Sequence, residues 1–235
     1  MTHYSIVTPA HNEAGNLPTL IEKIASVLDG KIDYNIVIVN DNSTDNSGEV
    51  LAGLQKKYKQ LDVVTRTKLG GVGYAIREGL YNAKGDFIIT MDGDLSHKPE
   101  QILDLLAAIK DKGLDMVCGS RYVARGASDM HLSRKIISRG YNVVFGTLLG
   151  LKVRDFTSGF RIFKRDFLEN IKFDSTGFGI YVEILMKAHL AGYKIGEIPI
   201  SYDVRGEGES NLNYFEQGPE YCRVALKTFK HKLFK

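Results

Sequence analysis

Two aspartates separated by one glycine are the clearest sign of chemistry in this sequence. The stretch IITMDGDLSHKPE (88–100) places Asp92 and Asp94 directly after an apolar run. Carboxylates this close repel each other where the dielectric is low, unless a cation neutralises them. A divalent metal that shares a diphosphate would do so, and oxygen ligands favour Mg²⁺ or Mn²⁺. The alternative is a solvated Asp-Gly turn, but the position at the exit of a buried strand favours the metal.

Two other segments carry acids where a strand should end. VIVNDNSTD (37–45) offers Asp41, which can accept from a nucleobase N–H or a ribose hydroxyl, while a residue of 43–45 caps the following helix. TPAHNEAGN (8–16) offers Glu13 to a ribose, against ordinary turn chemistry. On the ligand-binding interpretation, Asp41 and Glu13 would both contact a nucleotide.

The glycine-rich stretch KLGGVGYA (68–75) precedes a helix but is neither the Gly-x-Gly-x-x-Gly fingerprint nor a Walker A sequence. Its glycines either cradle phosphate or permit close helix packing. The segment 121–154 carries seven Lys/Arg and one acid around an apolar run. Arg134 and Ser138 share a helical face there. Guanidinium groups beside apolar residues suit an anionic lipid head group, whereas the alternative is an ordinary basic surface helix.

The C-terminal segment 221–235 has five Lys/Arg and no acid. Val224, Leu226, Phe229 and Leu233 are expected to form its apolar side. Such a helix can lie in a membrane interface, on its own domain or on a partner.

These residues need a sheet to bring them together. Val/Ile-rich strands are predicted at 4–9, 34–41, 61–66, 86–94 and 114–120, and helices at 16–28, 45–58, 72–83 and 99–111. A helix near 179–191 and a strand near 194–204 follow. This alternation predicts an α/β fold with a mostly parallel sheet and helices on both faces. Ligands bind outside the carboxyl ends of such strands, so the polar ends should converge on one rim.

Composition fits a chain with a sizeable core, since 43% of its 235 residues are hydrophobic and 25% are charged. A net charge of +3 argues against a nucleic-acid partner. Cys118 and Cys222 lack metal-ligand spacing, so we expect a reduced, intracellular chain. No signal peptide or membrane-spanning run is expected.

The quoted motifs TPAHNE, VNDNSTD, MDGDLSH, GSRY, DFTSGFRIF and RGEGES occur in this order over about residues 3–215. In this they resemble the family 2 glycosyltransferases with a GT-A fold, a Rossmann-like α/β architecture. More narrowly, they resemble the dolichyl- or polyprenyl-phosphate mannose synthases and their glucosyl relatives. The resemblance implies a catalytic domain at 1–213, with a donor half (1–120) and an acceptor half (121–213), before a basic amphipathic helix at 214–235.

The resemblance also implies roles for individual residues. The metal ligands and catalytic aspartates would be Asp92 and Asp94, with Arg205 closing over the diphosphate as a third catalytic residue. The donor, a nucleotide-sugar, would be bound by Pro9, Asn12, Glu13, Asp41, Lys68, Asp92, Gly93 and Asp94. The acceptor, a dolichyl or polyprenyl phosphate, would be bound by Arg121, Arg134, Ser138 and Ser210. The sequence departs from the family pattern at Asn40, Glu207 and Asn211.

The expected activity is therefore an inverting, Mg²⁺- or Mn²⁺-dependent transfer of a hexose, foremost mannose from GDP-mannose. We expect it at the cytoplasmic face of a membrane, with that surface or a small membrane subunit as partner. A phosphate acceptor is already anionic near neutral pH and needs no strong base. A glycan hydroxyl, with UDP-glucose or another donor, would need one, and Asp155 or Glu183 are the candidates. A non-catalytic nucleotide-sugar or lipid-phosphate binding subunit is the alternative of another class.

Overall fold

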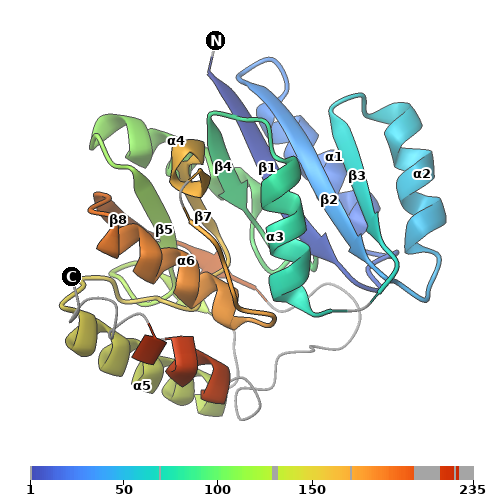
Figure 1. Cartoon of the computed structure of the whole chain (residues 1–235). Coiled ribbons are helices and arrows are strands. Elements are labelled where there is room, and N and C mark those ends of the chain that lie inside the picture. The colour runs from blue at the N-terminus through green and yellow to red at the C-terminus, as the bar shows by residue number, and fades with distance from the viewer. Residues whose placement is uncertain are drawn as a thin grey trace.

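A sheet of seven strands forms the centre of the molecule, in the order β3-β2-β1-β4-β7-β5-β8 (Figure 1). The strands are β1 His3–Ala10, β2 Asp33–Asp41, β3 Leu61–Arg66, β4 Phe87–Thr90, β5 Met116–Ser120, β7 Arg161–Lys164 and β8 Ile195–Pro199. Neighbouring strands run parallel, except that β7 is antiparallel to both β4 and β5. The predicted α/β fold with a mostly parallel sheet is confirmed.

The computed structural model of the chain describes residues 2–68, 70–128, 132–169, 171–203, 218–224 and 226–227, with the backbone alone at 128, 132–135, 145, 148 and 149. Its helices are α1 Leu17–Leu28, α2 Ser47–Lys57, α3 Val72–Asn82, α4 Ile102–Asp111, α5 Leu132–Leu149 and α6 Gly179–Leu190. Short 3-10 helices, Pro99–Gln101 and Arg165–Leu168, precede α4 and follow β7. Three of the four helices predicted in the donor half therefore start within two residues of their expected positions, whereas the fourth, expected from 99, begins with this 3-10 turn and continues as α4 from Ile102.

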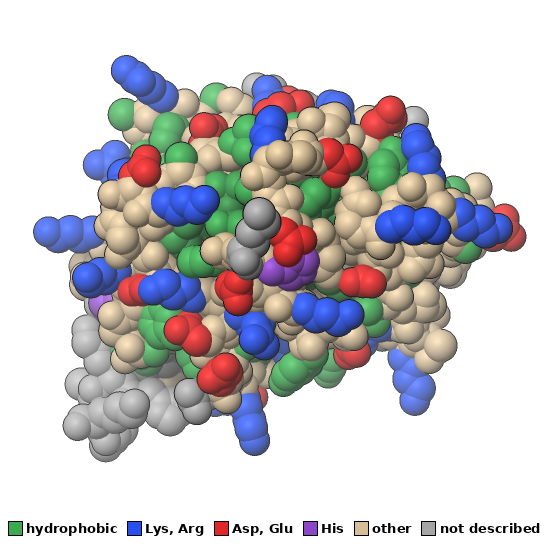
Figure 2. Space-filling view, turned by 90° about the horizontal axis from the view of Figure 1, so that it is seen from above, with side chains coloured by type: hydrophobic (Ala, Val, Ile, Leu, Met, Phe, Trp, Pro, Cys, Tyr) green, Lys and Arg blue, Asp and Glu red, His purple; other side chains and the backbone are tan. Residues whose placement is uncertain are grey.

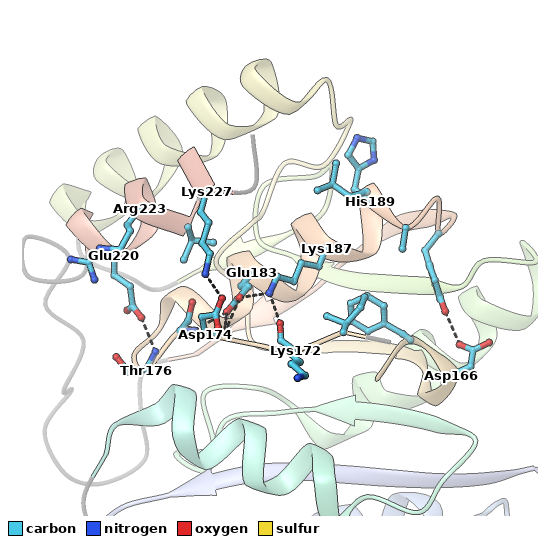
Figure 3. Close-up of a pocket in the computed structure, with 17 residues that line it drawn as sticks. Asp166, Lys172, Asp174, Thr176, Glu183, Lys187, His189, Glu220, Arg223 and Lys227 are labelled. Atoms are coloured by element: carbon cyan, nitrogen blue, oxygen red, sulfur yellow. Dashed lines mark hydrogen bonds and ion pairs between the residues drawn. The ribbon is translucent and has the colours of Figure 1, made fainter. Parts of the chain in front are cut away.

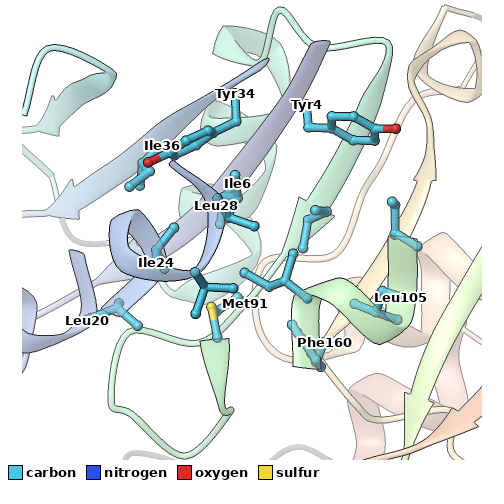
Figure 4. Packing of buried hydrophobic residues seen from close by; sticks show 14 of the residues in the cluster. Tyr4, Ile6, Leu20, Ile24, Leu28, Tyr34, Ile36, Met91, Leu105 and Phe160 are labelled. Atoms are coloured by element: carbon cyan, nitrogen blue, oxygen red, sulfur yellow. The ribbon is translucent and has the colours of Figure 1, made fainter. Parts of the chain in front are cut away.

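Both faces of the sheet are covered, which explains why its strands are continuously apolar. Ile6 packs with α1 and α4 on one face, while the next residue, Val7, packs with α3 and α6 on the other. Both side chains are fully buried, because successive strand residues point to opposite faces. Figure 4 shows the first layer, where Ile6 and Ile36 lie near Ile24 of α1. Each such aliphatic side chain stabilises the fold by about 1.5–3 kcal/mol.

The antiparallel strand β7 was not predicted as a strand. It spans only four residues and begins with Arg161, which is fully buried, so it lacks the apolar run that marks its neighbours. The strand predicted at 86–94 is shorter than expected, because β4 ends at Thr90 and the aspartates lie in the loop beyond it. The strand predicted near 194–204 divides into β8 and β9 (Ser201–Tyr202), and β9 pairs with β6 (Ala127–Ser128).

The described part of the C-terminal segment packs on its own domain. Residues 218–224 and 226–227 are helical and lie beside α5 (Figure 1). The buried ring of Tyr221 meets Tyr141 of α5 edge to face, with centroids 5.6 Å apart. Val224 is buried, whereas Leu226 of the predicted apolar side is 61% exposed. Phe229, Leu233 and the division at residue 213 lie outside the described residues.

Candidate active site

The loops that follow β1, β2 and β4 meet at the carboxyl edge of the sheet. Asn12 lies in the left-handed region (φ 56°), and its Oδ1 accepts from the N–H of Thr44 over 2.7 Å. A Cβ added to Gly93 would lie 2.9 Å from the carbonyl oxygen of Pro9. Strand ends from three separate segments are thus in direct contact, which confirms that the polar ends converge on one rim.

The loop that carries Asp92 and Asp94 is held by short polar contacts. Asp92 Oδ1 accepts a hydrogen bond from the Tyr181 hydroxyl over 3.1 Å. Asp94 Oδ1 accepts from the N–H (3.1 Å) and the hydroxyl (2.5 Å) of Ser96. Leu95, which lies between Asp94 and Ser96, takes a left-handed backbone (φ 65°). These hydrogen bonds fix the turn that carries both carboxylates at the exit of β4.

Burial raises the pKa of the Asp92 carboxyl, even though Tyr181, Arg121 and Arg161 act to lower it. Burial also raises the pKa of Asp94, and the neighbouring Asp92 carboxylate raises it further. Two carboxylates whose ionised forms are both disfavoured make a site that a cation would stabilise.

The metal-ligating side chains at this edge fit an ion that is shared with a bound ligand. Among the described residues, no group of three or more His, Cys, Asp and Glu side chains is arranged to hold an ion by itself. Two carboxylates leave most of an Mg²⁺ or Mn²⁺ shell to other oxygens, such as those of a diphosphate and water. The residues present therefore fit an ion that arrives with a phosphorylated ligand.

His97 is a part of this loop whose role the sequence did not reveal. Its buried Nδ1 accepts a hydrogen bond from the backbone N–H of Asp92 over 3.2 Å. Its ring stacks on Phe160 at 5.1 Å and meets the ring of Tyr202 edge-on at 5.2 Å. Burial lowers the pKa of His97 to about 4, so the ring is neutral near pH 7. The 3.6 Å approach of its Nδ1 to Asp92 Oδ2 is consequently no ion pair.

Arg161 and Tyr181 support Asp92 from inside the protein, and the sequence did not indicate either role. The Arg161 guanidinium is fully buried and donates to the carbonyl oxygens of Tyr181 (2.6 Å) and Ser158. It also lies 5.6 Å from the ring centroid of Tyr181. A buried cation with carbonyl partners keeps a positive potential behind the aspartates, which favours anions at this edge.

Asp41 lies at the end of β2 and is paired with Arg66 at the end of β3. The two residues are direct partners in the β2–β3 register. Burial raises the pKa of Asp41, against the lowering effect of Arg66. Arg66 also lies 5.3 Å from the ring centroid of Tyr74 in α3. Asp41, the carboxylate predicted to contact the nucleoside, is therefore paired with a cation, Arg66, which in turn contacts the aromatic ring of Tyr74.

The other predicted donor residues surround this edge. Glu13 is buried, and its Oε2 accepts from Asn16 Nδ2 over 2.6 Å. The helix expected from 45 begins two residues later, at Ser47 with Asn46 as its N-cap, and Asp45 Oδ1 accepts from the Ser47 N–H over 3.0 Å. Lys68 is exposed beyond β3. Asn40 is buried, and its Oδ1 is among the described side-chain atoms that have no hydrogen-bond partner.

On the acceptor side, Arg121 is bound by Asp155. Its Nε donates to Asp155 Oδ2 (2.7 Å), and its Nη2 donates to Asp155 Oδ1 (2.8 Å) and to Thr157 Oγ1 (2.9 Å). Ser138 of α5 is buried with its Oγ 3.4 Å from Thr157 Oγ1. Arg121 and Ser138 therefore share one neighbour, Thr157. The side chains of Arg134, Arg205 and Ser210 lie outside the described residues, as do Glu207 and Asn211.

Both side chains considered as a general base are engaged. Burial would raise the pKa of Asp155, but Arg121 outweighs it and the pKa is lowered. Glu183 is buried in α6, where it pairs with Lys187 (2.6 Å) and accepts from the N–H groups of Asp174 and Ser175. Both carboxylates are therefore held by cations or backbone N–H groups in this arrangement.

Other surfaces of the molecule differ from this edge. A groove of about 1070 Å³ lies between α6, the segment 166–176 and the C-terminal helix (Figure 3). Its described lining includes Glu183, considered above as a general base, but none of the predicted donor, acceptor or metal residues. Figure 2 looks onto the end of the sheet where β1 begins, and acidic and basic side chains are interspersed over that face. The mixed charges of the described residues give that face no extended electrostatic potential of one sign.

Comparison with known proteins assigns the chain to a family. The family model described as Glycosyl transferase family 2 matches residues 5–172, more than half of the chain. The chain belongs to glycosyl transferase family 2. It is 37% identical over 212 residues to a dolichol-phosphate mannosyltransferase of Pyrococcus furiosus, covering 88% of this chain and 58% of that protein. The chain thus spans less than two thirds of the length of this relative.

Two further relatives of this family 2 chain are also dolichol-phosphate mannosyltransferases. That of Mycosarcoma maydis is 33% identical, with 95% of this chain and 80% of the relative covered. That of Saccharomyces cerevisiae is 31% identical, with 89% and 81% covered. The predicted family and the narrower resemblance are confirmed.

Solved structures confirm the GT-A fold. Glucosyl-3-phosphoglycerate synthase from Mycobacterium tuberculosis, in complex with Mn²⁺, UDP and phosphoglyceric acid, has a TM-score of 0.73 at 20% identity, covering 97% of this chain and 78% of that one. The same enzyme with Mg²⁺ and UDP has a TM-score of 0.72. At this identity the likeness concerns the fold. Within the described part of the family 2 chain, no helix has the length and apolar character needed to span a membrane.

Proposed function

We propose that this family 2 chain transfers a hexose, foremost mannose from GDP-mannose, to the phosphate of a dolichyl or polyprenyl lipid. The observation that carries the proposal is the shared name of three relatives, dolichol-phosphate mannosyltransferase, at 31–37% identity. The geometry of the carboxyl edge supports it.

The donor is assigned to the acidic edge. Asp92 and Asp94 would hold Mg²⁺ or Mn²⁺ together with the donor diphosphate, and Asp41 and Glu13 would contact the nucleoside. Pro9, Asn12, Lys68 and Gly93 complete this donor site, and Arg205 is assigned to the diphosphate. A bound divalent metal would stabilise the negative charge of the leaving diphosphate.

The reaction is a single displacement with inversion at the anomeric carbon. A phosphate oxygen of the lipid forms a bond to C1 of the hexose while the bond from C1 to the diphosphate oxygen breaks. The nucleoside diphosphate leaves with that electron pair. No proton transfer is needed, because a phosphate monoester is largely dianionic above its second pKa of about 6. The engagement of Asp155 and Glu183 agrees with a reaction that requires no protein base.

The acceptor is assigned to Arg121, Arg134, Ser138 and Ser210. Beside Ser138, helix α5 exposes an apolar surface, since Ile136 is 62% and Val143 is 68% exposed. Exposed aliphatic residues on a basic helix suit the interface of a membrane. We therefore place the enzyme at a membrane surface, and the cytoplasmic side stays a prediction.

The test is transfer of labelled sugar by purified protein. GDP-mannose and UDP-glucose would each be supplied with polyprenyl phosphate micelles and with Mg²⁺ or Mn²⁺. We expect label from GDP-mannose in the organic phase, with wild-type protein but not with Asp94→Ala. An exposed-site variant, Glu78→Ala on α3, serves as the matched control.

Other outcomes would identify a different activity. Label that stays in water while nucleotide binds in the presence of metal would overturn the lipid acceptor. Transfer to a soluble glycan, unaffected by Arg134→Ala, would indicate a hydroxyl acceptor instead. Nucleotide binding without any turnover would indicate a binding subunit.

A further inference from the structure

A carboxylate from the C-terminal helix fills a ring of backbone N–H groups at the start of α6. Glu220 Oε1 accepts from the N–H of Thr176 (3.0 Å) and of Gly177 (2.9 Å), and Oε2 accepts from the N–H of Gly179 (3.2 Å). Figure 3 shows Glu220 reaching from its helix to Thr176. The first N–H groups of a helix lack partners within it, so an anion there is stabilising. We call these three N–H groups, 176–179, the Glu220 cradle.

The Glu220 side chain packs closely against Gly179. A Cβ added to Gly179 would lie 2.9 Å from Cδ of Glu220, nearer than Cβ atoms normally come to a neighbour. The helix that carries Glu220 is itself anchored by the buried Tyr221 against α5. The position of the carboxylate is therefore set by packing on both sides.

The opposite side of the cradle supports the glycine-rich start of α3. The carbonyl oxygen of Thr176, whose N–H is held by Glu220, accepts from the N–H of Gly73 over 3.0 Å. A Cβ added to Gly73 would lie 2.6 Å from the carbonyl oxygen of Ser175, and one added to Gly71 would lie 2.8 Å from that of Thr176. These glycines permit close packing of two backbones, one of the two roles expected of this stretch.

The same glycine-rich segment borders the predicted nucleoside carboxylate. Backbone N–H groups of Gly70 and Gly71 contribute hydrogen bonds that lower the pKa of Asp41 against the effect of its burial. Tyr74, one turn further along, stacks with Arg66, the partner of Asp41. A continuous set of contacts thus runs from Glu220 through Thr176 and Gly73 to Asp41.

We propose that Glu220 is a positioning residue for the nucleotide donor: it fixes the 176–179 turn and thereby the start of α3 beside Asp41. This inference rests on the proposed function, which assigns Asp41 to the donor. Glu220 acts through the backbone and touches no reacting atom. Its loss should consequently weaken donor binding, while turnover at saturating donor is retained.

The experiment removes the carboxylate and then supplies one from solution. Glu220→Ala in the full chain leaves the three N–H groups without their acceptor. Calorimetry with GDP and with UDP in the presence of Mn²⁺ should show a dissociation constant raised by about tenfold, the effect of losing charged hydrogen bonds. Acetate should restore part of the affinity, whereas chloride at equal ionic strength should not. A role confined to stability would not produce this anion-specific rescue.

Two variants keep the test decisive. Glu78→Ala removes an exposed glutamate from α3 and should bind nucleotide as wild type does. Glu220→Gln keeps the shape of the side chain, should fold if Glu220→Ala does not, and should give a smaller loss of affinity.

Each result has one interpretation. Wild-type affinity in Glu220→Ala, or in Glu220→Gln if only that variant folds, would overturn the inference. Weak binding that acetate and chloride leave equally unchanged would also overturn it. Failure of the wild-type chain to bind either nucleotide would instead overturn the proposed function.

Discussion

The hydroxyl of Tyr181, in α6, donates a hydrogen bond to Asp92 Oδ1, in the loop after β4, over 3.1 Å. The two residues are far apart in sequence, and the contact ties α6 to the loop that carries Asp92 and Asp94. This hydrogen bond stabilises the ionised form of Asp92, which burial disfavours.

Tyr181→Phe should therefore weaken metal activation. Without the hydroxyl, the ionised form of Asp92 loses a charge-assisted hydrogen bond, which is worth about 1.5–3 kcal/mol. We expect the Mn²⁺ concentration for half-maximal activity to rise about tenfold or more. Titration of transferase activity with Mn²⁺ measures this. Tyr81→Phe, at a tyrosine that is 75% exposed, is the control, and an unchanged Mn²⁺ requirement in Tyr181→Phe would contradict the prediction.

Asp94→Asn should separate stability from activity. The Asp92 and Asp94 carboxylates repel each other, so removing one charge should stabilise the metal-free protein. We expect a melting temperature raised by about 2–4 °C for each ~1 kcal/mol gained, together with loss of transfer. Thermal unfolding with and without Mn²⁺ tests this, because the metal should raise the melting temperature of wild type and much less that of the variant. Equal metal stabilisation of both proteins would place the ion elsewhere.

Asp155→Asn should be strongly destabilising. The change leaves the buried Arg121 guanidinium without its charged partner, and breaking a buried pair in this way costs about 3–5 kcal/mol. Urea unfolding measures the loss. Asp203→Asn breaks the exposed pair with Lys98 and should cost about 0–1 kcal/mol, so similar losses in the two variants would argue against the buried pair.

The buried Asp155–Arg121 pair also predicts that the protein loses folding stability in acid. The folded-state pKa of Asp155 is below its ordinary value of 3.8, so the folded state binds fewer protons than the unfolded state in that range. The stability that it contributes is fully present above about pH 4 and is lost as the pH falls through the lowered pKa. Wild-type unfolding free energy should decline more steeply than that of Asp155→Asn below pH 4.

Much of the donor edge could be predicted because it follows from continuous patterns. Apolar runs that end in Asp, Asn or Glu predicted both the parallel strands and their common rim. The pairing of Asp41 with Arg66 could also have been predicted from the sequence. The two residues end adjacent strands and are register partners, so aligning the ends of those strands would have placed them together.

The remaining features depend on tertiary contacts without a local pattern. Arg161 opens a four-residue strand that joins two halves of the sheet, and a buried arginine there interrupts the apolar signal. His97 is placed by rings that come from β9 and from the segment before β7. The docking of the C-terminal helix was left open because its charges suited a membrane equally well, and Tyr221 against Tyr141 shows where its described part packs.

Helix α5 provides the prediction that tests the membrane-surface part of the proposal. Ile136 and Val143 lie two turns apart on one side of the helix and are mostly exposed, so burying them in a lipid interface would stabilise binding by about 1.5–3 kcal/mol each. Ile136→Glu combined with Val143→Asp should reduce sedimentation with anionic vesicles by more than tenfold. The affinity for GDP with Mn²⁺ should not change, because neither side chain lies at the acidic edge. Tyr81→Glu, which places a charge at an exposed aromatic residue of α3, is the matched control. If the double variant sedimented with vesicles as wild type does, this face of α5 would not be the membrane-binding surface.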